Sequence, residues 1–219
     1  MPLPQVLIAI GLFLATHVAL AENPLRGLLV RGLGERPFAW SYGSLAVLQL
    51  LWINQAVDAA PVIPLWQPAW ASAIAFALTP LAILLLVCGF TQSNPTATLA
   101  RGRLARREVQ GILSITRNPV MWGLGLWSLS RLVVAGELAQ ALPYAAYAAL
   151  ALLFLPRIEA KQRARWGATA WADFTARSSS VPFLAMAQGR ARLNWREIGW
   201  ARIGASVALY GAFVAWTIR

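Results

Sequence analysis

The sequence predicts an all-α membrane protein that crosses the bilayer with six helices. Of its 219 residues, 58% are hydrophobic and only 12% are charged, about half the charged fraction of a soluble domain. Apolar stretches near 20 residues long recur, and each is long enough to cross a hydrocarbon layer about 30 Å thick. Because the backbone in lipid must hydrogen-bond to itself, these stretches are expected to be helices. Basic residues also gather in alternate loops, as membrane topology requires.

The six predicted spans are apolar runs bounded by charged, Pro-rich or Gly-rich segments. They cover residues 3–21, 38–56, 69–90, 119–135, 142–155 and 199–218. Pro119 sets the start of the fourth span, because a first helical residue needs no backbone donor and Asn118 before it is driven out of the helical conformation. Ala19-Leu20-Ala21 resembles a signal-peptidase site, but no Lys or Arg precedes the first apolar run. We expect the first helix to be retained, with cleavage as the alternative.

The placement of charge predicts the topology. Apart from Arg131 and Arg219, every Lys and Arg lies in the first, third or fifth loop or at its edge, whereas the second and fourth loops carry Asp58 and Glu137. By the positive-inside rule the odd-numbered loops are cytoplasmic, and no terminus lies on the cytoplasmic side. The same placement argues against a nucleic-acid partner, although the net charge is +11, because no single phosphate-binding face is formed. The lone Cys88 excludes an internal disulfide.

Two polar side chains inside predicted spans are candidate site residues. His17 is the only histidine, and imidazole is a haem-iron ligand and a proton carrier. A polar group in a membrane helix also hydrogen-bonds neighbouring helices, which is the alternative for His17. Arg131 is an intramembrane charge, and such charges often mark function. Its alternative is to snorkel to the nearby surface and pair with Glu137.

The start of the fourth span offers a third candidate. Arg117 and the backbone amides of a helix beginning at Pro119 could hold an anionic group, although a plain turn at the membrane surface explains the same residues. Glu159, just past the fifth span, should lie on the same side of the membrane and could pair with Arg117. Residues 157–174 interleave charged and aromatic side chains, which predicts either a helix lying in the membrane interface or a solvated basic linker.

At these residues the chain resembles the NnrU family of bacterial integral membrane proteins. The resemblance rests on Ser41-Tyr42, Ser44-Leu45, Pro64-Leu65-Trp66, Ser93-Asn94-Pro95-Thr96, Gly111-Ile112-Leu113, Thr116-Arg117, Pro119, Trp122-Gly123, Leu126-Trp127, Val181-Pro182-Phe183 and Gly189-Arg190. It implies a single transmembrane domain over residues 1–219, a bacterial inner-membrane location and a link to denitrification and nitric-oxide metabolism. A plant relative, zeta-carotene isomerase, is a haem b enzyme with histidine ligands. The Arg-x-Pro turn and the Glu159…Trp166-Gly167…Trp171 pattern also look distantly like isoprenylcysteine carboxyl methyltransferases, which bind S-adenosylmethionine there.

The chain departs from the family at its histidines. The family turn reads Arg-His-Pro, but here Asn118 stands in the middle, and Arg131 stands where the family places another histidine. Only His17 remains, so the two positions cannot supply a bis-histidine haem site. The resemblance therefore makes His17, Arg117, Asn118, Arg131 and Glu159 the candidate cofactor-binding residues, with His17 the candidate ligand of haem iron.

Three functions remain open at this point, and the sequence does not decide whether the protein is an enzyme. The first is a non-catalytic protein that sits in the lipid bilayer and binds a membrane protein partner or a lipophilic small molecule. The second is a haem b-dependent redox or isomerase protein that uses His17. The third is a membrane methyltransferase that uses S-adenosylmethionine.

Overall fold

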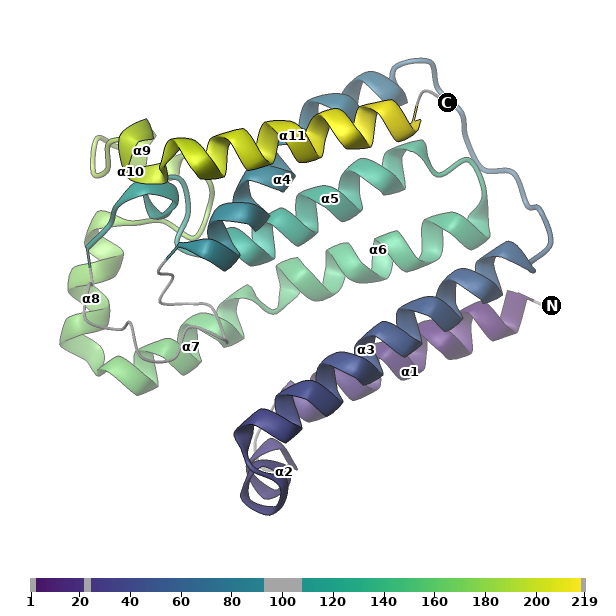
Figure 1. The fold of residues 1–219 in the computed structure, drawn as a ribbon, viewed down its shortest axis with the longest axis horizontal. Helices are drawn as coiled ribbons and strands as arrows, with labels where there is room; N and C mark the ends of the chain where they lie inside the picture. Colours follow the sequence, from purple (N-terminus) through teal and green to yellow (C-terminus); the bar gives the residue numbers. More distant parts are fainter. Residues whose placement is uncertain (1–2, 22–24, 93–107, 218–219) are drawn as a thin grey trace. The chain divides into compact units, whose positions relative to one another are not determined.

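The computed structural model describes residues 3–21, 25–92 and 108–217, and within these ranges the regular elements are helices (Figure 1). In chain order the elements are α1 (Leu3–Ala21), α2 (Leu25–Leu33), α3 (Glu35–Asp58), α4 (Ala71–Thr91), the 3-10 turn η1 (Gly111–Ser114), α5 (Pro119–Val134), α6 (Leu138–Leu153), α7 (Leu155–Trp166), α8 (Ala168–Arg177), α9 (Leu184–Ala187), α10 (Trp195–Ile198) and α11 (Trp200–Thr217). The expected all-α class is confirmed, and each of the six predicted spans corresponds to a helix.

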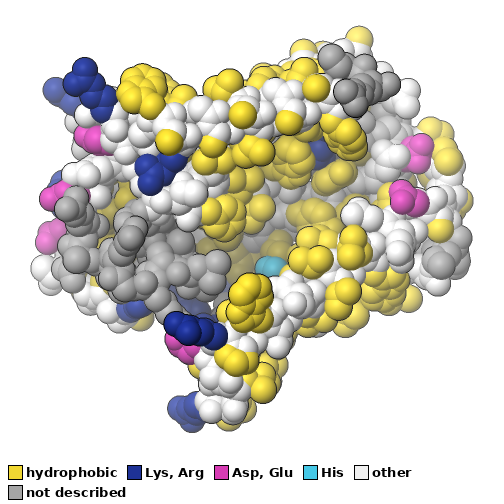
Figure 2. Space-filling view, in the orientation of Figure 1, with side chains coloured by type: hydrophobic (Ala, Val, Ile, Leu, Met, Phe, Trp, Pro, Cys, Tyr) yellow, Lys and Arg dark blue, Asp and Glu magenta, His cyan; other side chains and the backbone are white. Residues whose placement is uncertain are grey.

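Three of these helices are long and apolar enough to cross a membrane. They are Leu3–Leu20, Ala71–Thr91 and the continuous stretch Leu138–Trp166. Pro119–Val134 is apolar but shorter. The helix α3 is longer than α5, but it carries Glu35, Arg36 and Asp58 near its ends and the buried Gln49 within it. Figure 2 shows hydrophobic side chains along the exposed surface of the long helices, as expected where helices contact lipid.

The chain divides into two compact units, which are described separately. The first comprises Met1–Pro68 and Val134–Ala146. Its centre is the pairing of α1 with α3, and Val6, Ala9 and Phe13 of α1 and Ile53 of α3 are buried. The segment after α3 pairs with the segment before α6, because the Leu65 amide donates to the Gly136 carbonyl at 2.8 Å and the Leu138 amide donates to the Ile63 carbonyl at 2.9 Å.

Polar groups also join α1 to α3. Thr16 Oγ1 lies 3.0 Å from Gln49 Oε1, within hydrogen-bonding distance. One position further along α1, the His17 ring packs against Phe13 and against Tyr42 of α3, with ring centroids 4.9 and 5.3 Å apart. The proposed role of His17 in helix packing therefore has a physical basis, whereas a ligand role stays a prediction.

The second unit comprises Ala69–Val133 and Tyr147–Arg219. Here α4 packs against α11, and α5 approaches α4 closely at two glycines. A Cβ on Gly89 would lie 3.0 Å from the Val120 amide nitrogen, and one on Gly123 would lie 3.1 Å from the Ala82 carbonyl oxygen. The absence of a side chain at these positions lets the helix backbones meet, as is common between membrane helices.

One core cluster lies at the end of this unit where α4 stops and α5 and α11 start. It contains Leu85, Cys88, Ile112, Leu113, Ile115, Trp171, Phe174 and Ile198. The segment predicted as an interface helix or a basic linker is in fact two helices, α7 and α8, separated by Gly167 at a φ of +83°. The linker alternative is wrong. The aromatic side chains Trp171 and Phe174 are buried in the protein core, so they are not the lipid-facing residues of an interface helix.

A polar clasp closes the same end. Glu197, in α10, accepts the Gly111 amide at 2.9 Å through Oε2, and Gln92 Nε2 donates to the Glu197 carbonyl at 2.9 Å. Gln92 Oε1 in turn accepts the Ile112 amide at 3.1 Å. Gly111 has a φ of +56°, and a Cβ there would collide with the Gln92 amide. The clasp therefore requires glycine at position 111.

Candidate functional site

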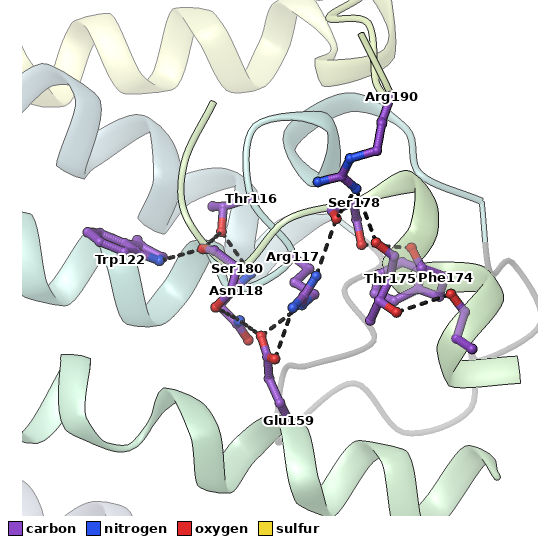
Figure 3. A network of polar contacts seen from close by, with 11 residues as sticks. Thr116, Arg117, Asn118, Trp122, Glu159, Phe174, Thr175, Ser178, Ser180 and Arg190 are labelled. Carbon is purple, nitrogen blue, oxygen red and sulfur yellow. Dashed lines mark hydrogen bonds and ion pairs between the residues drawn. The ribbon is translucent and has the colours of Figure 1, made fainter. Parts of the chain in front are cut away.

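The start of α5 carries a network of polar contacts that joins it to α7 and to the segment after α8 (Figure 3). The turn before the helix is shaped by Thr116, whose Oγ1 accepts the Asn118 amide at 3.2 Å. Pro119 then opens the helix without needing a hydrogen-bond acceptor. The local sequence thereby directs Arg117 and Asn118 toward α7, which contributes Glu159.

Arg117 and Glu159 form a two-point ion pair. Arg117 Nε donates to Glu159 Oε1 at 2.7 Å, and Arg117 Nη2 donates to Glu159 Oε2 at 3.0 Å. The two side chains are 13% and 21% exposed, so the pair is largely shielded from water and is stronger than a surface pair. The pairing of Arg117 with Glu159, predicted from their common side of the membrane, is present.

Asn118 completes the coordination of this carboxylate. Its Nδ2 donates to Glu159 Oε1 at 2.8 Å and to Ser180 Oγ at 3.0 Å. The side chain is fully enclosed, with 1% of Asn118 exposed. The opposite amide orientation would place Oδ1 against the carboxylate, so the charge of Glu159 fixes how the amide points. The anionic group at this helix start is thus the protein's own Glu159.

A serine run supplies the other wall of the network. The Arg117 amide donates to the Ser179 carbonyl at 2.8 Å. The Ser180 carbonyl accepts both Thr116 Oγ1 and Trp122 Nε1 at 2.7 Å. These bonds attach residues 178–180, which follow α8, to the start of α5. Asn118 is thereby enclosed between this segment and Glu159.

Two further side chains support the network. Arg190 Nη1 donates to the Ala176 and Ser178 carbonyls, each at 2.9 Å, and so satisfies the end of α8. The Arg117 guanidinium lies 5.8 Å from the ring centroid of Trp171, a cation–π contact. Arg117 therefore contacts a carboxylate, a carbonyl and an aromatic face at once.

Arg131 lies elsewhere in the same unit, roughly 20 Å further along α5. Its guanidinium carbon is 4.8 Å from the Phe213 ring centroid and 5.6 Å from that of Trp127. Trp127 and Phe213 also meet edge to face, so Arg131 joins α5 to α11. Its expected pairing with Glu137 stays a prediction.

The structure therefore brings only three of the five candidate residues together. Arg117, Asn118 and Glu159 form one site, Arg131 forms a separate aromatic contact, and His17 belongs to the other unit. Sequence reasoning missed Ser178, Ser180 and Arg190 as parts of the network. The signal available for them was the uninterrupted Ser178-Ser179-Ser180 run directly before Val181-Pro182-Phe183.

The donor set does not fit a bis-histidine haem. Asn118 is buried and bonded to Glu159 and Ser180, and Arg131 lies over two aromatic rings. Neither side chain is a ligand of haem iron. Within the described residues, no group of three or more His, Cys, Asp or Glu side chains could hold a metal ion.

Comparison with known proteins assigns the chain to a family. The family model described as NnrU protein matches residues 5–218. The chain belongs to the NnrU family. No curated protein and no solved structure gives a significant match. This NnrU protein combines apolar helices able to cross a membrane with a polar network at the start of α5. The segment Ser93-Asn94-Pro95-Thr96, which contributed to the resemblance, lies outside the described residues.

Proposed function

We propose that this NnrU protein is a non-catalytic, single-domain protein of a bacterial inner membrane that binds a membrane protein partner or a lipophilic molecule. The observation that carries the proposal is that both carboxylate oxygens of Glu159 are already bonded within the protein. Its carboxylate accepts bonds from Arg117 Nε, Arg117 Nη2 and Asn118 Nδ2. A carboxylate that is paired with a guanidinium and also accepts a hydrogen bond from an amide is a weak base. The same bonds stabilise the packing of α5 against α7. The family's association with denitrification and nitric-oxide metabolism suggests the setting in which such a partner would act.

The proposal includes six membrane crossings with the odd-numbered loops in the cytoplasm and both termini outside. The supporting features are the alternating placement of Arg and Lys and the match of each predicted span to a helix. The helices α3, α5 and α11 would supply the remaining three crossings.

Cysteine labelling in intact cells tests this topology. We expect Asp58→Cys, at the exposed end of α3, to react with a membrane-impermeant thiol reagent added from outside. Arg165→Cys, exposed on α7, should react only after the cells are permeabilised. Cys88 is buried, so the unmodified protein should give little background. External labelling of Arg165→Cys would overturn the proposed topology.

Purification in mild detergent tests the two cofactor-dependent alternatives and the expected partner, and catalytic turnover by the purified protein would overturn the non-catalytic proposal. We expect a preparation without a Soret band, even after haem is added, and without measurable S-adenosylmethionine binding, because the family's histidines are replaced and Glu159 is already bonded. We also expect mass spectrometry to find a co-purifying membrane protein or lipophilic molecule. Absorption spectra, calorimetry and mass spectrometry of one preparation give all three results.

Two alternatives would show themselves in that preparation. A Soret band that shifts in His17→Ala would support haem ligation by His17 in place of the proposal. The methyltransferase alternative is favoured by one observation, because Arg117 and Glu159, which the distant resemblance aligns with a cofactor site, meet beside Trp171. Binding of S-adenosylmethionine that is weakened in Arg117→Ala and Glu159→Ala would replace the non-catalytic proposal with this one.

A further inference from the structure

The segment around the short helix α9 exposes three large apolar residues and buries a small one, while Met186 of the helix is partly buried against the core cluster. Ala185 is completely buried, whereas Leu184 is 40% exposed and Phe183, directly before the helix, is 42% exposed. Val181, two residues earlier, is 50% exposed. A segment packed for water would have the opposite arrangement, with Leu and Phe inside and the small residue outside. Val181, Phe183 and Leu184 therefore face something other than the protein core.

Phe183 also adopts a strained backbone conformation. Its φ is +63°, and it is the one non-glycine residue with positive φ among the residues that the structure describes. Its amide donates to the Ile115 carbonyl at 2.8 Å, which holds the strained turn against the end of η1. Glycine would adopt this φ without strain. Because a bulky ring that is half-exposed gains little from the protein itself, the strain points to a role for the ring outside the chain.

A second group of exposed residues lies around α10. Trp195 and Trp200 are 50% and 69% exposed, while Ile198 between them is fully buried. Arg192 and Arg196 are exposed beside them. The helix α10 packs against η1, the element that Phe183 also adjoins through Ile115. Exposed tryptophans interleaved with arginines are typical of segments that lie at the surface of an anionic bilayer.

One contact indicates where Trp200 lies along the membrane axis. Arg202, two positions into α11 after Trp200, donates from Nε to Thr91 Oγ1 at 2.9 Å. Thr91 is the last residue of α4, one of the three helices that are apolar enough to cross a membrane. Trp200 therefore lies level with the end of a membrane-spanning helix, where hydrocarbon gives way to headgroups.

We propose that Val181, Phe183, Leu184, Trp195 and Trp200 form an interfacial anchor that inserts shallowly into the bilayer, with Arg192 and Arg196 binding anionic phospholipid headgroups. The apolar side chains enter the boundary between headgroups and acyl chains, and the arginines stay among the phosphates. This anchor is independent of the number of crossings and of the proposed non-catalytic role. The partner of the anchor is the same membrane that the long helices cross. The competing occupants of this surface are a second copy of the chain and another protein.

Depth-dependent quenching tests the anchor. A fluorescent label is attached to Leu184→Cys in a Cys88→Ala background, and the full-length protein is reconstituted in nanodiscs that contain phosphatidylglycerol and brominated phosphatidylcholine. We expect the brominated lipid to quench this label several-fold more than a label on Asp173→Cys, which is exposed on α8. Val181→Cys provides a second labelling site should Leu184→Cys fold poorly. Iodide in the buffer should quench the two positions in the reverse order.

Other outcomes of this experiment reject the anchor. A Leu184→Cys label that iodide quenches as strongly as the Asp173→Cys label lies in water. A label protected from both iodide and brominated lipid is covered by protein, which would indicate a second copy or another subunit. The charge contribution is tested by Arg192→Gln with Arg196→Gln, which should reduce lipid quenching only in nanodiscs with phosphatidylglycerol. Equal quenching of this variant with and without phosphatidylglycerol, unchanged from the parent, would remove the arginines from the proposal.

Position 183 provides a matched pair of variants. Phe183→Ala keeps the backbone strain and removes the ring, whereas Phe183→Gly removes both. We expect both variants to reduce lipid quenching of the Leu184→Cys label, and Phe183→Gly to be the more heat-stable of the two in detergent. Unreduced lipid quenching in both variants would contradict a role for the ring in membrane contact.

Discussion

Glu159→Ala is expected to lower the free energy of unfolding by about 3 kcal/mol, the lower end of the cost of breaking a buried ion pair. The variant leaves the Arg117 guanidinium and the Asn118 amide without their shared acceptor, in a site that is largely closed to water. The cost falls at the lower end because the side chains of Arg117 and Glu159 retain 13% and 21% exposure. Denaturant titration in detergent, followed by tryptophan fluorescence, measures the change.

Matched variants distinguish the effect of losing the ion pair from the effect of losing any negative charge. Glu108→Ala removes an exposed carboxylate in the same unit and should change stability by no more than about 0.5 kcal/mol. Arg117→Ala with Glu159→Ala should cost clearly less than the sum of the single variants, because each single change leaves the other charge unpaired. Additive costs would mean that the two side chains do not stabilise one another.

Gly89→Val is expected to destabilise the protein by about 3 kcal/mol, the upper end of the cost of overpacking. A Cβ at position 89 would lie 3.0 Å from the backbone nitrogen of Val120 and 2.7 Å from its Cγ2. A side chain can rotate away, but the backbone at the start of α5 cannot, because the bonds of Arg117 and Asn118 hold it. The helices α4 and α5 must therefore separate, and a valine branch worsens the clash. The same unfolding titration measures the loss.

The chain contains a suitable control for this substitution. Gly211 lies in α11 of the same unit, and a Cβ there would meet no atom within 4 Å. Gly211→Ala should be neutral or raise stability by up to about 1 kcal/mol, since alanine favours helix over glycine. Equal losses from Gly89→Val and Gly211→Ala would show that close helix approach is not the cause.

The helix positions were largely predictable, because hydropathy and proline chemistry act locally. The first helix covers the predicted residues, and α5 begins at Pro119 as the Asn118-Pro119 step requires. Helix ends that depend on tertiary contacts were less accurate, since α3 begins at Glu35 and not at residue 38. The short elements η1, α9 and α10 were not predicted. Their few residues carry no periodic pattern, and the polar clasp and the core cluster hold them.

The site was only partly predictable, because its partners are distant in sequence. The side of the membrane sufficed to pair Arg117 with Glu159, which are 42 positions apart. Ser180 lies 62 positions from Asn118, and the serine run that contains it does not indicate which distant side chain it bonds. The direction of Trp171 and Phe174 was likewise unpredictable, since an aromatic stripe on a basic helix suits a protein core as well as a membrane surface.

The clasp formed by Gln92, Gly111 and Glu197 fixes where the end of α4 lies relative to the start of η1. Gln92 bonds directly to the Ile112 amide, and Glu197 accepts the Gly111 amide. Residues far apart in the chain, and not only the backbone that links α4 to η1, therefore determine how these two elements meet.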